Sequence, residues 1–284
     1  MGTPKLVLLT ALAMLAFAAN SVLARLAFAT AGAEPLTYTG IRLGSGALVL
    51  ALLLSLRSRS LPRIGGSWRG AAALFAYAIF FSVAYVMLGA AVGALILFAA
   101  VQVGIIGWAI RKGDRPGALE WAGIATAFAA LVYLVSPGLV APHPLGAALM
   151  AIAGLAWAAY TLLGRGSAAP LVDTAGNFIR TVPVALLLII IGGLTASLSL
   201  PAVGYAVASG AIASGLGYAL WYAALPFLTR TRAAVVQLTV PAIAAAGGVL
   251  LIAEPLTPRL VIASIGILGG VALALLAAER RKCG

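Results

Sequence analysis

Aromatic and amide side chains stand at helical spacing inside several long apolar runs of this sequence. Tyr218, Trp221 and Tyr222 follow the i, i+3, i+4 spacing that places side chains on one face of a helix. Such faces stack on a planar apolar group and hydrogen-bond a polar one, so they predict the wall of a binding cavity. The candidate binding residues are Phe17, Asn20, Tyr77, Phe81, Tyr85, Phe98, Gln102, Trp157, Tyr160, Tyr218, Trp221, Tyr222 and Gln237.

The same residues also have a structural interpretation. Tyr and Trp are typical of membrane interfaces, and Gln can hydrogen-bond between packed helices. Interfacial anchoring suits residues at the ends of an apolar run and not those in its middle. The strongest binding candidates are therefore those well inside their runs, namely Asn20, Gln102, Trp157, Tyr160 and Gln237.

Two arginines and one proline add candidates of another kind. Arg42 and Arg180 lie inside or near the ends of apolar runs, where a charge is costly and commonly functional, so each could meet a substrate carboxylate. Both also lie within two turns of a helix start, from where the side chain could extend to a headgroup. Pro241 frees a backbone carbonyl beside the Gln237 face and is the candidate gating residue.

Enzymatic chemistry has few candidates, and we expect no enzyme, cofactor or metal site. No Gly-rich loop followed by Lys and Ser or Thr is present to hold ATP phosphates. The single His143 stands beside prolines in an expected loop, and the single Cys283 lies in the polar tail. Glu120 and Glu254 fall at the ends of apolar runs, which favours helix capping or a loop salt bridge over proton coupling.

Composition sets the environment of these residues. Of 284 residues, 63% are hydrophobic and 8% are charged, with a mean hydropathy of +1.14, whereas a soluble domain is about 25% charged. The runs are continuous rather than alternating, which excludes a β-barrel. The first run resembles a signal peptide, but nine similar runs follow it. We expect an all-α integral membrane protein with ten transmembrane helices at residues 6–28, 36–56, 70–89, 93–110, 119–136, 145–163, 177–195, 203–225, 233–253 and 260–278.

The distribution of positive charge predicts the topology. Counting from the N-terminal side, alternate links and the two ends carry 14 of the 18 lysines and arginines. Because positive loops stay in the cytoplasm, both termini are expected there, in a bacterial-type inner membrane. The net charge of +12 is explained in this way, and nucleic-acid binding is not expected because no basic stripe with interleaved aromatics is present.

An internal repeat divides the chain into residues 1–140 and 141–284. Residues 14–25 (MLAFAANSVLAR) match residues 154–165 (GLAWAAYTLLGR) at an offset of 140, including Arg25 with Arg165 and the aromatic pair Phe17 with Trp157. A repeat of five helices is odd, so the second copy enters the membrane from the other side. This is the inverted-topology arrangement of many secondary transporters, built around a central cavity.

Two five-helix halves, together with the string from Gly247 through Glu254-Pro255 to Val271, resemble the EamA-domain members of the drug/metabolite transporter superfamily. The first half departs from the pattern, with Asp114-Arg115-Pro116 where the second has Glu254-Pro255. Within the superfamily the chain looks most like the YddG-type exporters of aromatic amino acids. The resemblance implies ten helices and export of small metabolites through a central cavity.

Three functions follow from these observations. The first is a secondary, ATP-independent transporter that exports amino acids, aromatic ones preferred, and similar small metabolites by alternating access. The second is a proton-coupled multidrug or cation efflux transporter, which the lack of a mid-span carboxylate disfavours. The third is a non-transporting membrane assembly or lipid-modifying factor. The expected partners are a small-molecule substrate and the lipid bilayer, and the oligomeric state is left open.

Overall fold

The computed structural model describes residues 3–58, 64–113, 115–136, 141–196, 199–228 and 230–283, and these ranges contain helices and turns but no β-strand. Apolar runs form helices because a helix satisfies its own backbone hydrogen bonds where lipid offers none. The long helices are α1 (Thr3–Arg25), α2 (Pro35–Ser58), α3 (Trp68–Met87), α4 (Ala90–Arg111), α5 (Ala118–Val135), α6 (Pro144–Leu163), α7 (Pro170–Thr195) and α12 (Pro258–Cys283).

Two spans are built from shorter pieces. The eighth comprises α8 (Leu200–Val207), the π-helical η2 (Ala208–Leu216), α9 (Gly217–Ala224) and the short η3 (Leu225–Phe227). The ninth is interrupted at Leu238, between α10 (Arg230–Gln237) and α11 (Thr239–Ile252). The first span also ends in a π-helical segment, η1 (Leu26–Thr30). Taken together, ten segments in the described ranges are long and apolar enough to cross a membrane, which confirms the predicted number.

Helix starts explain most of the observed boundaries. Ser67, Ser199 and His143 cap α3, α8 and α6 by accepting hydrogen bonds from backbone N–H groups of the first turn. The seventh span begins at Pro170 rather than at the predicted residue 177. A proline is favoured in the first turn because its missing N–H would have no partner there.

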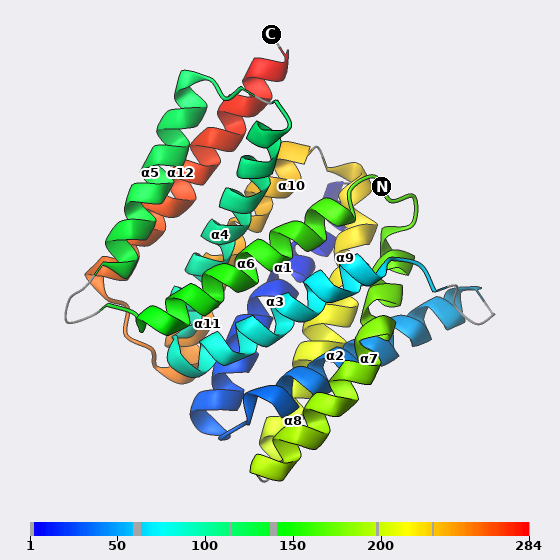
Figure 1. The fold of residues 1–284 in the computed structure, drawn as a ribbon. Coiled ribbons are helices and arrows are strands. Elements are labelled where there is room, and N and C mark those ends of the chain that lie inside the picture. Colours follow the sequence, from blue (N-terminus) through cyan, green and yellow to red (C-terminus); the bar gives the residue numbers. More distant parts are fainter. Residues whose placement is uncertain are drawn as a thin grey trace.

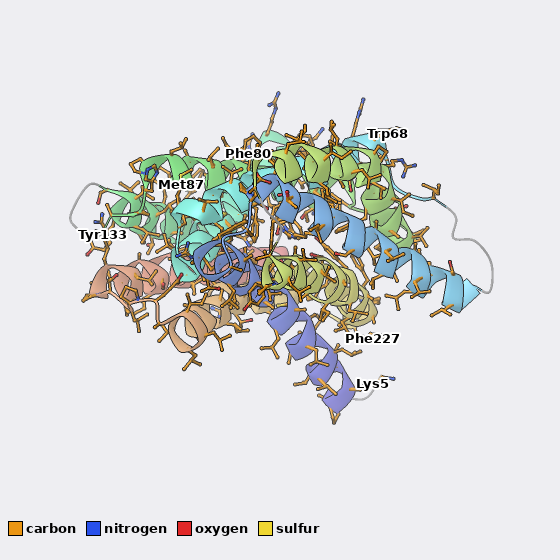
Figure 2. The ribbon with its side chains drawn as sticks, turned by 90° about the horizontal axis from the view of Figure 1, so that it is seen from below. Lys5, Trp68, Phe80, Met87, Tyr133 and Phe227 are labelled. Carbon is orange, nitrogen blue, oxygen red and sulfur yellow. The ribbon has the colours of Figure 1, made fainter. Side chains whose placement is uncertain are left out.

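The helices pack in definite pairs (Figure 1). α5 lies along α12 at one side of the bundle, α2 lies along α7, and α6 packs against both α3 and α4. α1 packs against η2, α9 and α11 in the centre. Figure 2 shows the first turns of α1 extending beyond the other helices, with Lys5 near their end.

Small residues allow close contacts between helices, as Gly123 and Gly210 illustrate. At the α5–α12 contact, a Cβ on Gly123 would lie 2.5 Å from the carbonyl oxygen of Gly270. In η2, a Cβ on Gly210 would collide with the backbone carbonyl of Arg42 on α2. Small side chains allow this approach between apolar helices. The second contact places η2 directly against the backbone of Arg42, whose charged side chain is buried.

Candidate functional site

A cavity runs into the bundle from the link between α6 and α7. Its outer part, the vestibule, has a water-accessible volume of about 330 Å³ and is lined at its mouth by the link residues 164–167 and by Leu225. Its inner part, the deep chamber, is narrower and ends at Arg42 and Phe81. The two parts share Phe17, Trp157 and other lining residues, so they adjoin each other, and together they are called the cavity. The vestibule falls within the range of about 300–1,000 Å³ typical of small-molecule sites.

Aromatic rings from five helices form the walls of this cavity. Trp157 on α6 stacks on Tyr218 of α9, with ring centroids 5.7 Å apart and an angle of 21° between the planes. Tyr77 on α3 meets Trp157 edge-on at 4.5 Å, and Phe17 on α1 meets Tyr218 edge-on at 5.6 Å. Offset and edge-on arrangements are the favoured ones for aromatic pairs. The rings therefore hold one another in place around the space between them.

Most of the predicted binding residues lie around one cavity. All but two of them line the cavity, from α1, α3, α4, α6, α9 and α10. The deep chamber or the vestibule is lined by Phe17, Asn20, Tyr77, Phe81, Phe98, Trp157, Tyr160, Tyr218, Trp221, Tyr222 and Gln237.

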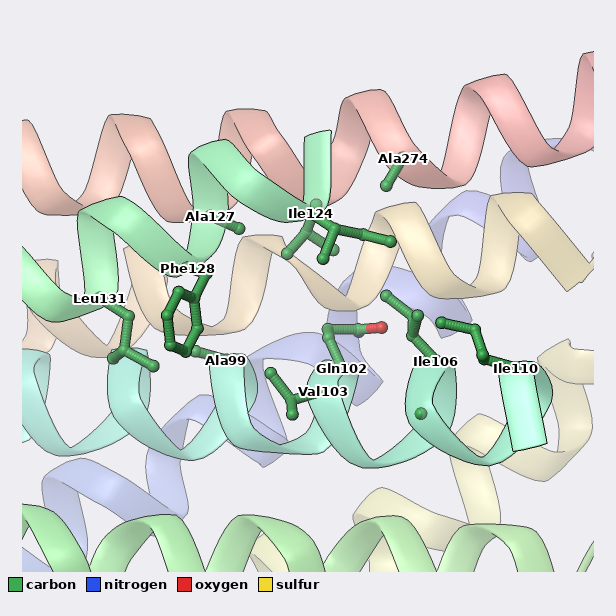
Figure 3. Close-up of a pocket in the computed structure, with 12 residues that line it drawn as sticks. Ala99, Gln102, Val103, Ile106, Ile110, Ile124, Ala127, Phe128, Leu131 and Ala274 are labelled. Carbon is green, nitrogen blue, oxygen red and sulfur yellow. The ribbon is translucent and has the colours of Figure 1, made fainter. Parts of the chain in front are cut away.

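Gln102 and Tyr85 lie elsewhere. Gln102 lines a separate apolar groove of about 200 Å³ between α4, α5 and α12, where its amide lies beside Ile106 (Figure 3). It lies one turn from Phe98 on the same face of α4, yet Phe98 lines the deep chamber and Gln102 lines this groove. Tyr85 is fully buried below the chamber, with its ring 4.6 Å from that of Phe81.

A serine–asparagine cluster ties the π-helical segment to α1. The amide oxygen of Asn20 accepts hydrogen bonds from the hydroxyls of Ser209 at 2.8 Å and Ser214 at 3.3 Å. All three residues are buried, and Asn20 and Ser214 line the deep chamber. Because its oxygen is occupied, Asn20 has its NH₂ group left to donate to a ligand.

A second chain of hydroxyl groups joins α6, α7 and α9 in the vestibule. Tyr160 donates to Thr174 at 3.1 Å, and Thr174 donates to Tyr222 at 3.2 Å. Thr174 is buried between the two tyrosines. Both tyrosines were predicted from sequence, but Thr174 was not, because it falls in the predicted link between residues 163 and 177, which the structure shows as the start of α7.

The two candidate arginines have different environments. Arg42 is 3% exposed and lies in the deep chamber, where one guanidinium nitrogen donates to the hydroxyl of Tyr77 at 2.9 Å. Arg180 instead donates to the backbone carbonyls of Gly65 and Gly176 and packs over Trp68. Arg180 lines neither part of the cavity. Its contacts fasten the α2–α3 link to α7, which corresponds to a structural role.

Pro241 is buried in the first turn of α11. A proline has no N–H to donate to the carbonyl four residues earlier, here that of Gln237, and its ring crowds that carbonyl. The ninth span is interrupted at Leu238, between these two residues. Interrupted helices line the sites of many transporters, and Gln237, at the break, lines both parts of the cavity.

A salt bridge lies at the end of the bundle opposite the mouth. Arg25 at the end of α1 donates to the carboxylate of Glu254 at 3.1 Å and to the carbonyl of Tyr85. The same carboxylate accepts from the N–H of Ala90, at the start of α4, at 2.8 Å. We call Arg25, Glu254 and Ala90 the latch. In Figure 1 the α6–α7 link lies at the upper right and the α11–α12 link, which carries Glu254, at the lower left.

The acidic residues at span ends have the capping role that the sequence analysis favoured. Glu254 caps α4, and Glu120 caps its own helix by accepting from the N–H of Gly117. Among the residues that line the cavity the only carboxylate is Asp173, at the mouth, where it accepts from the N–H of Gly66. The described residues contain no group of three or more His, Cys, Asp or Glu side chains placed to hold a metal ion.

Comparison with known proteins identifies the family and the fold. Residues 144–276 match the EamA-like transporter family. Over 268 residues the chain is 51% identical to Uncharacterized protein PA1977 of Pseudomonas aeruginosa, covering 94% of this chain and 93% of that protein. A crystal structure of another protein has the same fold, with a TM-score of 0.64 and 21% identity over 94% of this chain and 98% of that one.

The fold and these matches define a membrane transporter of the drug/metabolite type. The chain belongs to the EamA-like transporter family, within the drug/metabolite transporter superfamily.

Proposed function

We propose that the protein exports amino acids, aromatic ones preferred, and similar small metabolites across a bacterial-type inner membrane. The observation that carries the proposal is the cavity walled by stacked and edge-on aromatic rings, with amide and hydroxyl groups among them. Aromatic walls bind a planar side chain, and the polar groups bind the remaining part of an amino acid. No ATP site is required, so the substrate gradient or a coupled ion supplies the driving force.

Alternating access is supported by the different states of the two ends. The vestibule is open at the α6–α7 link, while the latch closes the opposite end. The positive-inside rule assigns the open end and both termini to the cytoplasm. Arg25 belongs to the closed end, and its repeat partner Arg165 lines the open mouth. Transport then requires the latch to open and the mouth to close.

The packing pairs support two inverted repeats as the basis of this exchange. A two-fold relation between residues 1–140 and 141–284 pairs the first span with the sixth and each following span with the one five further on. Under that relation the contact of α3 with α6 corresponds to that of α1 with η2 and α9, and both contacts are present. The contacts of α2 with α7 and of α5 with α12 correspond to themselves.

The test is flux in proteoliposomes of the full chain, with labelled L-tryptophan, L-phenylalanine and L-threonine and without ATP or an ion gradient. We expect gradient-driven flux of the aromatic amino acids. Trp157→Ala should lower it at least about tenfold, because it removes rings from the centre of the cavity wall. Trp121→Ala is the matched control, since Trp121 is half-exposed on the outside of α5.

Two results would reject the proposal. One is an absence of flux for every amino acid, even with an imposed proton gradient. The other is proton-dependent efflux of a cationic dye that Glu120→Gln or Glu254→Gln abolishes, which would favour the multidrug alternative.

A further inference from the structure

Arg42 is a buried cation whose charge has no counter-charge. None of the described carboxylates lies within salt-bridge distance of Arg42, and none lines the deep chamber. The guanidinium of Arg42 packs over the rings of Phe81 and Tyr77, 4.6 and 5.2 Å from their centroids. One of its terminal nitrogens, Nη2, donates to Tyr77, and the other, Nη1, has no hydrogen-bond partner. Ring faces offset only part of the cost of burying a charge.

The surroundings of Arg42 contain neutral polar groups that can donate hydrogen bonds, but no carboxylate. The hydroxyl of Tyr218, which lines the same chamber, is also buried without a hydrogen-bond partner. The hydroxyl of Tyr77 accepts from Arg42 and so keeps its own hydrogen to donate. Asn20, which lines the same chamber, has its NH₂ group left to donate. A ligand with two acceptor oxygens and a negative charge satisfies this set, because an arginine fork matches a carboxylate.

Arg180, which is half-buried in its span, has the hydrogen-bond acceptors that Arg42 lacks. Arg180 is bonded to two backbone carbonyls, and its neighbourhood contains Asp173 and Asn177 from the same helix end. No residue that lines the deep chamber is acidic. The chamber is therefore organised around a charge that a bound molecule must balance.

We propose that Arg42 and Tyr77 bind the carboxylate of the transported molecule, so that the protein selects carboxylate-bearing solutes and rejects their cationic, decarboxylated analogues. This inference rests on the proposed function, because it places the carboxylate in the cavity that the proposed function assigns to the substrate. It adds an orientation, in which the carboxylate lies at the inner end of the deep chamber and the aromatic side chain lies against Trp157 and Tyr218 toward the vestibule.

The test is binding to the purified full chain by calorimetry, with three molecules that share an indole ring. L-Tryptophan carries an amine and a carboxylate, indole-3-propionate carries only the carboxylate, and tryptamine carries only the amine. We expect both carboxylates to bind and tryptamine to bind roughly 10- to 100-fold more weakly, the range given by hydrogen bonds to a charged group. Arg42→Gln should remove this preference, and Arg69→Gln, the same change at an exposed position, should keep it.

Two milder variants keep the test decisive if Arg42→Gln fails to fold. Arg42→Lys retains the charge without the planar fork, and Tyr77→Phe removes one hydroxyl. Each should weaken both carboxylates and leave tryptamine unchanged. Equal binding of L-tryptophan and tryptamine to the wild type, or unchanged carboxylate affinity in both milder variants, would overturn the Arg42 subsite while leaving the aromatic cavity in place. Binding of L-threonine that depends on Arg42, without binding of L-tryptophan, would instead support the subsite and reject the aromatic preference.

Discussion

Arg25 and Glu254, 229 residues apart in the chain, meet in a salt bridge of 3.1 Å at the end of the bundle opposite the cavity mouth. The pair joins the end of α1 to the end of α11, and the N–H of Ala90 adds the start of α4. Three elements that must separate for this end to open are thus held by one carboxylate. Both side chains are mostly buried, with 20% and 13% of their surface exposed, so water screens the pair only partly.

Removing either partner of this salt bridge should favour opening of the latch end. We expect Arg25→Ala and Glu254→Gln each to destabilise the closed state by about 1–3 kcal/mol, the range for a hydrogen bond to a charged group. The measurement uses a chain in which Cys283 is replaced by Ser and Phe98 by Cys, so that the only cysteine lies in the chamber. An impermeant maleimide added from the latch side should label this cysteine at least about tenfold faster in the two latch variants than in the chain with the intact latch.

Arg259→Ala is the matched control for the latch. Arg259 lies at the same end but donates to the carbonyl of Tyr133 and to Ser136. The Arg259→Ala substitution should leave the labelling rate unchanged. Equal labelling of the wild type and both latch variants would show that this salt bridge does not control access.

Arg180→Gln should lower stability without changing which molecules bind. The substitution removes the bonds that fasten Gly65 to α7, while the bonds from Asp173 and Asn177 to the same link remain. We expect a loss of about 1–3 kcal/mol, seen as a lower midpoint of thermal unfolding, and an unchanged ratio of L-tryptophan to tryptamine affinity. A selective loss of carboxylate binding in this variant would place Arg180 in the site and contradict its structural role.

The part of this structure that could be predicted from sequence is the part decided by local rules. Hydropathy identified ten spans because each run must bury its own backbone in lipid. The spacing of Tyr218, Trp221 and Tyr222 identified a cavity face because side chains three and four apart share a helix face. The seventh span began earlier than predicted because its polar first turns, with Asp173, bond to the α2–α3 link. That contact joins residues more than 100 positions apart and leaves no local signal.

The remaining differences arise from helix rotation and long-range pairing. Gln102 was expected to line the same cavity as Phe98, yet it lines the groove between α4, α5 and α12, which only the tertiary packing creates. The salt bridge of Arg25 with Glu254 and the serines on Asn20 also depend on the tertiary arrangement. The sequence identified Arg42 as a charge that is costly inside a span. It did not indicate whether another group of the protein would compensate that charge.

Ser209→Ala should loosen the π-helical segment from α1. The substitution removes the shorter of the two hydrogen bonds to Asn20, so we expect a loss of about 0.6 kcal/mol, the average for such bonds between membrane helices, and at most about 1.7 kcal/mol. The measurement is the midpoint of thermal unfolding in detergent. Ser264→Ala is the control, because its hydroxyl bonds only to the carbonyl of Leu260 in the same helix, and it should cost less. Equal losses in the two variants would argue against a special role for the Asn20 cluster.

Ala253 is the one non-glycine residue with a positive φ, 54°, among those described, and it directly precedes Glu254. It ends α11 in the left-handed conformation, which lets the N–H of Glu254 donate to the carbonyl of Gly248 and directs the carboxylate toward Arg25 and Ala90. A side chain in this conformation is strained by about 1 kcal/mol relative to glycine. Ala253→Gly should therefore raise the free energy of unfolding by about that amount, because glycine is the favoured residue after a helix end. Ala263→Gly, buried inside α12, is the opposite control and should destabilise. A loss of stability in Ala253→Gly would mean that the left-handed turn is not what positions Glu254 for the latch.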